Sequence, residues 1–214
     1  MSLIAPAILA ENLDQYKEQI DKVSGFTERA HIDVSDGIFA PSVTVKPDEI
    51  WWPENWEVDI HAMIMNPTDY LQTLISLKPS MVIIHAEAQG ELGSVMQTFK
   101  QYDIKAGLAL LRHTVPLDVE QLIKLADHVM VFTGDLGRYG GKASLMQLEK
   151  VRLIKQINPM AEIGWDGGVA VDNAYTLTQG GVNVLNSGGA IQQASNPKEV
   201  YDLLVQEINK KGVI

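Results

Sequence analysis

The sequence contains no cysteine. This absence excludes disulfide-stapled scaffolds, cysteine-ligated zinc or iron–sulfur sites, and catalysis by a thiol nucleophile. It is also typical of proteins kept in a reducing compartment, so we expect the protein to be cytoplasmic. The first residues lack a basic stretch and have only a short apolar run, so no secretory signal is expected.

Positive charge is scarce, with 17 Lys and Arg against 27 Asp and Glu and a net charge of −10. A surface of that sign repels phosphate backbones and anionic lipids, so we expect neither nucleic acid nor a membrane as a partner. No apolar run approaches the roughly 18 residues that span a bilayer. A small anionic ligand is still compatible with this charge, because a local group of backbone amides can bind it.

No linker or low-complexity run divides the 214 residues, so we expect a single domain over residues 1–214. Within it, eight short apolar segments alternate with amphipathic segments of helical period. The apolar segments cover residues 3–8, 30–34, 58–64, 81–85, 106–111, 129–132, 162–165 and 182–185. Such alternation favours a parallel sheet covered by helices, and eight units in this length are typical of a (β/α)8 TIM barrel. A doubly wound open α/β sheet is the alternative on the pattern alone.

Asparagines mark the starts of three expected helices. Asn12 stands before an amphipathic stretch and is placed to cap it. The pairs Asn66-Pro67 and Asn196-Pro197 each combine a capping residue with a proline suited to the first helical position. We therefore expect all three asparagines to act as N-caps.

Polar residues gather at the ends of the expected strands, where barrel enzymes place their active sites. These residues are His31, Asp33, Asp59, His61, His85, Glu87 and Asp166. Because side chains alternate along a strand, His31 and Asp33 point to one side, as do Asp59 and His61. Two histidines and two carboxylates meeting there would suit a divalent metal such as Zn, Fe, Mn or Co. The alternatives are a merely solvated barrel mouth, a buried Asp59 that caps a loop, and a Glu87 that only orients a ligand.

Glycine pairs follow the last three strands. They are Gly140-Gly141 within the segment 137–142, Gly167-Gly168, and Gly188-Gly189. Loops after the seventh and eighth barrel strands often bind phosphate through backbone amides, and glycine lets the anion approach closely. Lys142 or Arg138 is placed to add a positive charge. Glycine pairs also occur in ordinary turns, which is the alternative interpretation.

The aromatic residues near these loops allow two interpretations each. Tyr139 either closes over a substrate or simply packs. Trp51-Trp52 and Trp56 either stack on a ligand or pack under a loop or in a subunit interface. Met63 is ordinarily a core residue.

Taken together, these segments resemble those of the ribulose-phosphate 3-epimerases. APAIL at residues 5–9 resembles that family's opening strand, and residues 31–41 (HIDVSDGIFAP) resemble its H-x-D-V-M-D-G-x-F-x-P segment. Residues 59–63, 85–87, 107–110, 166–168 and 187–190 follow in the family's order, over essentially the whole chain. The resemblance implies a (β/α)8 barrel of the ribulose-phosphate binding type, which binds one divalent metal and a ketose phosphate, and we expect a homo-oligomer.

The resemblance also implies roles for individual residues. The family's metal ligands match His31, Asp33, His61 and Asp166, and its two acid–base groups match Asp33 and Asp166. In that mechanism, two aspartates on opposite faces of a planar enediolate invert C3, which interconverts D-ribulose 5-phosphate and D-xylulose 5-phosphate or close analogues. The expected substrate contacts are Ala7, His61, Met63, Tyr139, Gly140, Gly141, Lys142, Gly167, Gly168, Gly188 and Gly189.

The chain departs from the family pattern around the expected substrate. Ala7 replaces a serine, Ser35 a methionine, Ile38 a histidine and Gly189 a serine, and residues 111–113 replace an asparagine-containing segment. A hexulose phosphate as substrate, or a sugar-phosphate-binding barrel without turnover, is therefore the alternative. Barrels resembling orotidine-phosphate decarboxylase carry D-x-K-x-x-D on the third strand, whereas residues 59–64 read DIHAMI and lack the lysine.

Overall fold

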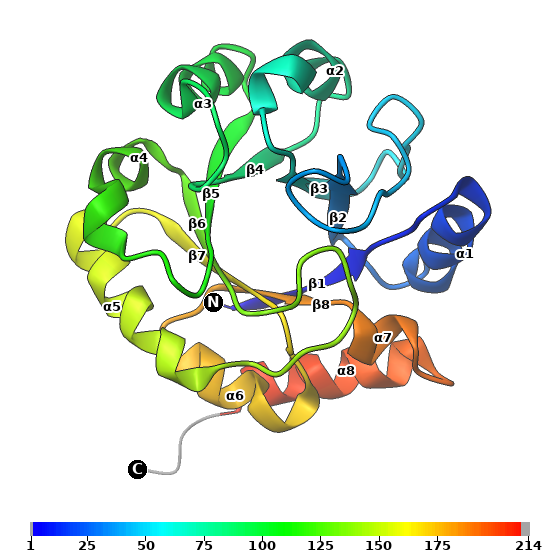
Figure 1. The fold of residues 1–214 in the computed structure, drawn as a ribbon. Coiled ribbons are helices and arrows are strands. Elements are labelled where there is room, and N and C mark those ends of the chain that lie inside the picture. Colours follow the sequence, from blue (N-terminus) through cyan, green and yellow to red (C-terminus); the bar gives the residue numbers. More distant parts are fainter. Residues whose placement is uncertain (1, 211–214) are drawn as a thin grey trace.

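The computed structural model describes residues 2–210, which form a closed parallel β-barrel surrounded by helices (Figure 1). Its strands are β1 (Leu3–Ile8), β2 (Arg29–Ser35), β3 (Glu57–Met63), β4 (Met81–His85), β5 (Lys105–Leu110), β6 (His128–Phe132), β7 (Glu162–Asp166) and β8 (Val184–Ser187). The α-helices are α1 (Leu13–Val23), α2 (Leu71–Ser76), α3 (Leu92–Gln101), α4 (Glu120–Leu125), α5 (Leu148–Ile157), α6 (Val171–Gln179), α7 (Gly189–Gln192) and α8 (Pro197–Ile208). Because β1 pairs with β8, the sheet has no open edge, which confirms the barrel and excludes the doubly wound sheet.

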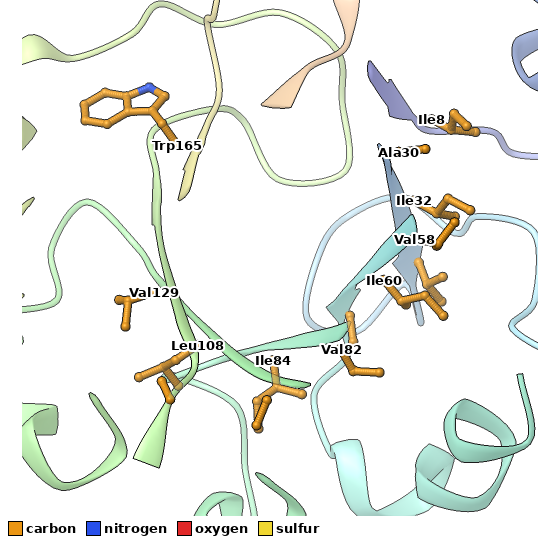
Figure 2. Packing of buried hydrophobic residues seen from close by; sticks show 14 of the residues in the cluster. Ile8, Ala30, Ile32, Val58, Ile60, Val82, Ile84, Leu108, Val129 and Trp165 are labelled. Carbon is orange, nitrogen blue, oxygen red and sulfur yellow. The ribbon is translucent and has the colours of Figure 1, made fainter. Parts of the chain in front are cut away.

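Strand alternation sorts the side chains into two layers. The outward-facing residues of the strands are apolar and pack against the helices in one large cluster, part of which is shown in Figure 2. Ile32 on β2 and Ile60 on β3 are examples, and both are completely buried. The residues beside them in sequence face the barrel interior, so His31, Asp33 and His61 point inward. The apolar face therefore fixes the direction of the polar one.

One expected placement and one expected strand boundary are wrong. β3 spans Glu57–Met63, close to the expected residues 58–64, so Asp59 lies early in the strand and not at its end. β8 begins at Val184 and finishes with Asn186 and Ser187, two residues later than the apolar pattern indicates. Val182 instead belongs to the turn after α6, where its N–H donates to the Leu177 carbonyl. Asn186 and Ser187 are polar, yet both pair with β1, because the carboxyl end of a barrel strand lies at the active-site mouth and admits polar side chains.

The helix caps follow the expectation in two cases of three. The Asn12 side chain accepts a hydrogen bond from the N–H of Gln15 at 3.0 Å, and the Asn196 side chain accepts one from that of Glu199 at 3.3 Å. Asn66 does not cap a helix, and that expectation is wrong. A 3-10 turn, Pro67–Tyr70, follows it, and its side chain donates to Asp69 instead.

The tryptophans favour the packing interpretation. Trp56 is buried in the main cluster, and Trp52 packs against that cluster. Trp51 is 44% exposed and meets the Tyr16 ring edge-on, while the Tyr16 hydroxyl donates to the Trp51 carbonyl. Among residues 2–210, no helix has the length and apolar character needed to cross a membrane.

Candidate active site

Four side chains predicted from the sequence meet at the carboxyl end of the barrel. His31 and Asp33 come from β2, His61 from β3 and Asp166 from β7, and one ligand atom of each lies within 4.8 Å of all the others. Asp33 is directly opposite His61 in the β2–β3 register, and β7 supplies Asp166 from elsewhere around the barrel. Closure of the barrel thus brings together residues that are far apart in the sequence.

The distances within this group suit a cation. His61 Nδ1 lies 2.7 Å from Asp33 Oδ1 and 3.6 Å from Asp166 Oδ2. His31 Nε2 lies 3.4 Å and 3.5 Å from the same two carboxylates. Both ring nitrogens of His31 are buried and have no hydrogen-bond partner among residues 2–210, which is costly for an imidazole away from water. Imidazole nitrogens and carboxylate oxygens of this kind fit a divalent transition-metal ion.

The carboxylates and histidines strongly perturb one another. Burial lowers the pKa of His31, but the carboxylates of Asp166 and Asp33, 3.5 and 3.4 Å from its Nε2, outweigh burial and raise that pKa to about 10. Burial also opposes ionisation of Asp33, yet His31 and His61 hold its pKa well below the usual range. Asp33 is therefore a carboxylate at neutral pH, the form that binds a metal or accepts a proton.

Behind His61 lies a second layer that the sequence only partly indicated. His61 Nε2 is 2.8 Å from His85 Nε2, and His85 Nδ1 is 3.3 Å from Glu87. Glu87 also accepts from the Leu111 N–H at 3.0 Å and from the Thr114 hydroxyl. Burial lowers the pKa of His85 to about 4. The hydrogen bond with Glu87 raises this pKa, whereas the charge of the neighbouring His61 lowers it further. The sequence had placed His85 at the end of β4 and had offered Glu87 as a residue that orients a ligand, but it gave no signal for the contact between His61 and His85.

A cavity of about 290 Å³ opens above these residues. Asp33, Asp166, Ala7 and Met63 line it, whereas His31 and His61 are buried beneath. All six glycines of the three pairs line it as well, and so do Tyr139, Arg138 and three residues that the sequence did not single out, Phe132, Asn186 and Gln193. Lys142 is exposed and does not line it. Of the two expected cations, only Arg138 faces this space.

Gly167 shows why glycine is required next to the cavity. Its φ is +101°, and a Cβ built there would lie 1.9 Å from the backbone nitrogen of Gly134 in the loop after β6. Only a residue without a side chain allows these two loops to touch. The contact holds the backbones that follow β6 and β7 side by side along one wall of the cavity.

Asp59 is buried, as one interpretation of the sequence had it, but it neither lies at the barrel mouth nor caps a loop. It is buried toward the opposite end of the barrel, where Arg29 Nε donates to its Oδ2 at 2.8 Å. The same guanidinium pairs with Glu162 through two bonds of 3.0 and 2.7 Å, and His128 Nδ1 lies 2.8 Å from Glu162. Asp59 therefore belongs to a partly buried ion network that is separate from the active site.

Comparison with known proteins identifies the family. The sequence profile of the "Ribulose-phosphate 3 epimerase family" matches residues 3–192. This chain belongs to that family. A ribulose-phosphate 3-epimerase of Helicobacter pylori (strain ATCC 700392 / 26695) is 30% identical over 202 residues, which cover 91% of this chain and 93% of that protein. That of Bacillus subtilis (strain 168) is 30% identical over 211 residues, 93% of this chain and 96% of the relative.

Solved structures show the same fold at lower identity. 3-Hexulose-6-phosphate synthase from Salmonella typhimurium superposes with a TM-score of 0.69 at 19% identity and covers 97% of this chain and 98% of its own. KGPDC from Streptococcus mutans gives a TM-score of 0.68 at 13% identity, with 97% of each chain covered. At these identities the likeness shows the barrel alone. The profile match makes the chain a member of an isomerase family, as its motifs indicated.

Proposed function

We propose that the protein inverts the configuration at C3 of a ketose phosphate, with D-ribulose 5-phosphate and D-xylulose 5-phosphate as the first pair to test. The observation that carries this proposal is the placement of Asp33 and Asp166. They come from β2 and β7, and both line the cavity with ligand oxygens within 4.8 Å of each other. The names of the relatives support the same reaction.

A divalent ion, such as Zn, Fe, Mn or Co, is part of the proposal. His31, Asp33, His61 and Asp166 would hold it, and the unpartnered nitrogens of buried His31 are the feature that fits it best. When bound, such an ion supplies a Lewis-acid charge to oxygens of the substrate. Asp33 and Asp166 lie close together in this group, where two carboxylates repel each other. The positive charge of a bound ion would offset that repulsion.

The two carboxyl groups perform the proton transfer. One carboxylate removes the proton from C3, the C–H electron pair forms the C2–C3 double bond of an enediolate, and the π pair of the C2 carbonyl moves onto its oxygen. The other carboxyl group returns a proton to C3 from the opposite face, so the configuration inverts and no atom is gained or lost. Two acidic groups at one site share protons unevenly because like charges repel, so one carboxylate is ready to accept while the other carries a proton.

The glycine-lined part of the cavity is proposed to bind the phosphate. Gly140-Gly141, Gly167-Gly168 and Gly188-Gly189 bring backbone close to this space, and Arg138 adds one positive charge. Ala7 and Met63 line the same cavity and would contact the sugar, with His61 beneath them. Assembly into a homo-oligomer, a cytoplasmic location and the absence of nucleic-acid partners stay predictions.

Proton NMR in D2O tests the function directly. Metal-reconstituted protein is incubated with ribulose, xylulose and hexulose phosphates, and the C3 proton signal is followed. We expect loss of that signal together with appearance of the C3 epimer. Faster exchange of a hexulose phosphate than of the pentulose phosphates would favour the altered substrate. Binding of sugar phosphate with an untouched C3 proton would support a binding protein without turnover and contradict the proposal.

A further inference from the structure

Tyr139 joins the loop after β6 to the other side of the barrel mouth. That loop, residues 133–144, extends across toward β1 and α7 (Figure 1). At its far point the Tyr139 hydroxyl accepts a hydrogen bond from the Leu9 N–H at 2.7 Å and lies 2.5 Å from Gln19 Oε1. The Ala7 carbonyl is 3.1 Å away. Since a hydroxyl has one proton, it donates to the nearer acceptor, Gln19.

Gln19 is itself held in a fixed orientation. Its Oε1 lies 2.9 Å from the Leu9 nitrogen, whose N–H is shared between this oxygen and the Tyr139 hydroxyl, and its Nε2 donates to the Leu9 carbonyl at 2.7 Å. The carboxamide cannot rotate without breaking both bonds, so its oxygen stays directed at Tyr139. Gln19 lies on α1, 120 residues away from Tyr139 in the sequence. The contact thus ties a loop to a helix on the far side of the mouth.

The Tyr139 ring is also a wall of the candidate active site. A Cβ built on Gly188 would lie 2.5 Å from the ring. On the other side of Tyr139 is a groove of about 380 Å³, lined by Gln15, Gln19, Ser42 and Thr44 among others. This groove and the active-site cavity share five lining residues, which are Leu9, Gly137, Arg138, Tyr139 and Gln193. The ring therefore separates the two spaces.

A second contact pins the loop just before Tyr139. The Ser42 hydroxyl donates to the Gly137 carbonyl at 2.7 Å. Gly140 and Gly141 come directly after Tyr139, and their φ angles are +113° and +86°. Glycines in that region have wide conformational freedom, so without an anchor their amides would be poorly ordered before a ligand binds.

We propose that Tyr139 and Gln19 form a latch that positions the Gly140-Gly141 amides for the phosphate of the substrate. Tyr139 acts as a positioning residue: its hydroxyl holds the loop, and the loop backbone makes the contact with the anion. The identity of the ligand rests on the function proposed above. An amide that is already in place does not have to be ordered at the moment of binding, so the latch raises affinity and leaves the chemical step unchanged.

The test compares Tyr139→Phe, Gln19→Leu and the double variant, with Tyr102→Phe as the matched control. Tyr102 directly follows the last residue of α3 and is 56% exposed, so we expect loss of its hydroxyl to leave phosphate affinity and loop exchange unchanged. Dissociation constants for inorganic phosphate and for D-ribulose 5-phosphate are measured by calorimetry, and kcat and KM by a coupled assay. Hydrogen exchange of residues 133–144 reports the order of the loop.

We expect Tyr139→Phe to weaken both ligands by about threefold to tenfold, the effect of losing one partly buried hydrogen bond. KM should rise by a similar factor with kcat within about twofold, and exchange of the loop should accelerate. Because Tyr139 and Gln19 act through one contact, the double variant should lose clearly less affinity than the product of the two single losses.

Unchanged phosphate affinity together with unchanged exchange in Tyr139→Phe would overturn the latch, as would multiplicative effects of the two substitutions. A fall in kcat at constant KM would also contradict it. The outcome is separate from that of the epimerase proposal. If no ketose phosphate is turned over, phosphate affinity and loop exchange still decide whether the latch exists.

Discussion

His61 Nε2 and His85 Nε2 face each other at 2.8 Å, so a single proton lies between them. The other nitrogen of His61, Nδ1, faces Asp33 and Asp166 in the proposed metal-binding group. If Nδ1 is the ligand atom, Nε2 carries the proton of the neutral ring and donates it to His85. His85 then carries its own proton on Nδ1 and donates it to Glu87, 3.3 Å away. This assignment satisfies every nitrogen of the two rings, and it makes Glu87 the end of a chain that orients His61.

We therefore expect Glu87→Gln to weaken metal binding by about 10- to 100-fold, since the orienting partners of a metal-bound histidine typically contribute that much. Metal affinity is measured by competition with a chelator after stripping and reloading the protein. Glu54→Gln, on an exposed loop, is the matched control. Equal affinities of the wild type and Glu87→Gln, with both folded, would show that Glu87 does not support the site.

Asp33→Asn and Asp166→Asn should each reduce epimerisation by at least about 10²–10⁴-fold, because each removes a proton-transfer group. The rate is measured with both epimers as substrate, and proton NMR in D2O follows exchange at C3. A variant that retains the metal and lacks the acid–base group on only one face of the enediolate should still exchange deuterium into one epimer. If either variant kept near wild-type epimerisation, its aspartate would have no acid–base role.

Gly167→Ala should lower the free energy of unfolding by at least about 2 kcal/mol, because an alanine at φ +101° is strained and its Cβ overlaps the backbone of Gly134. For a chain of this length that corresponds to a fall in Tm of roughly 4–8 °C. Gly25→Ala is the matched control, since a Cβ there meets no atom within 4 Å. Similar melting temperatures for the two variants would mean that the β6 loop moves aside freely.

The ion network at the opposite end of the barrel predicts a pH dependence of stability. Burial raises the pKa of Glu162, but hydrogen bonds and charges from His128 and Arg29 outweigh it and hold that pKa well below the usual range. A carboxylate of this kind stabilises the fold above its unfolded pKa of about 4.3, and the contribution is lost as the pH falls from there toward the folded pKa. The stability advantage of the wild type over Glu162→Gln should thus be largest at neutral pH and shrink below about pH 4.5.

Urea unfolding between pH 3.5 and pH 7 measures this difference. Glu149→Gln serves as control, because the ion pair of Glu149 with Arg152 lies in solvent and contributes little. An advantage over Glu162→Gln that persisted undiminished at pH 3.5 would contradict the lowered pKa of Glu162.

Much of the fold could be predicted from the sequence, because hydrophobic periodicity is a local property. The alternation of apolar strands and amphipathic helices indicated the barrel, and the same alternation along β2 and β3 sent His31, Asp33 and His61 inward. The motifs around them indicated the family before any contact was known. Boundaries were missed where polarity misled: β8 continues through the polar Asn186 to Ser187, two residues beyond the apolar segment.

Only the tertiary structure decided how far each polar residue lies from the barrel mouth and which residues it meets. Asp59 and His61 share one face of β3 but lie two residues apart along the strand. Asp59 therefore pairs with Arg29, whereas His61 belongs to the proposed metal site. The contacts of His61 with His85, and of Tyr139 with Gln19, join segments 24 and 120 residues apart. No local pattern encodes such pairs, because they arise from the closure and register of the whole sheet and from the path of a glycine-rich loop across it.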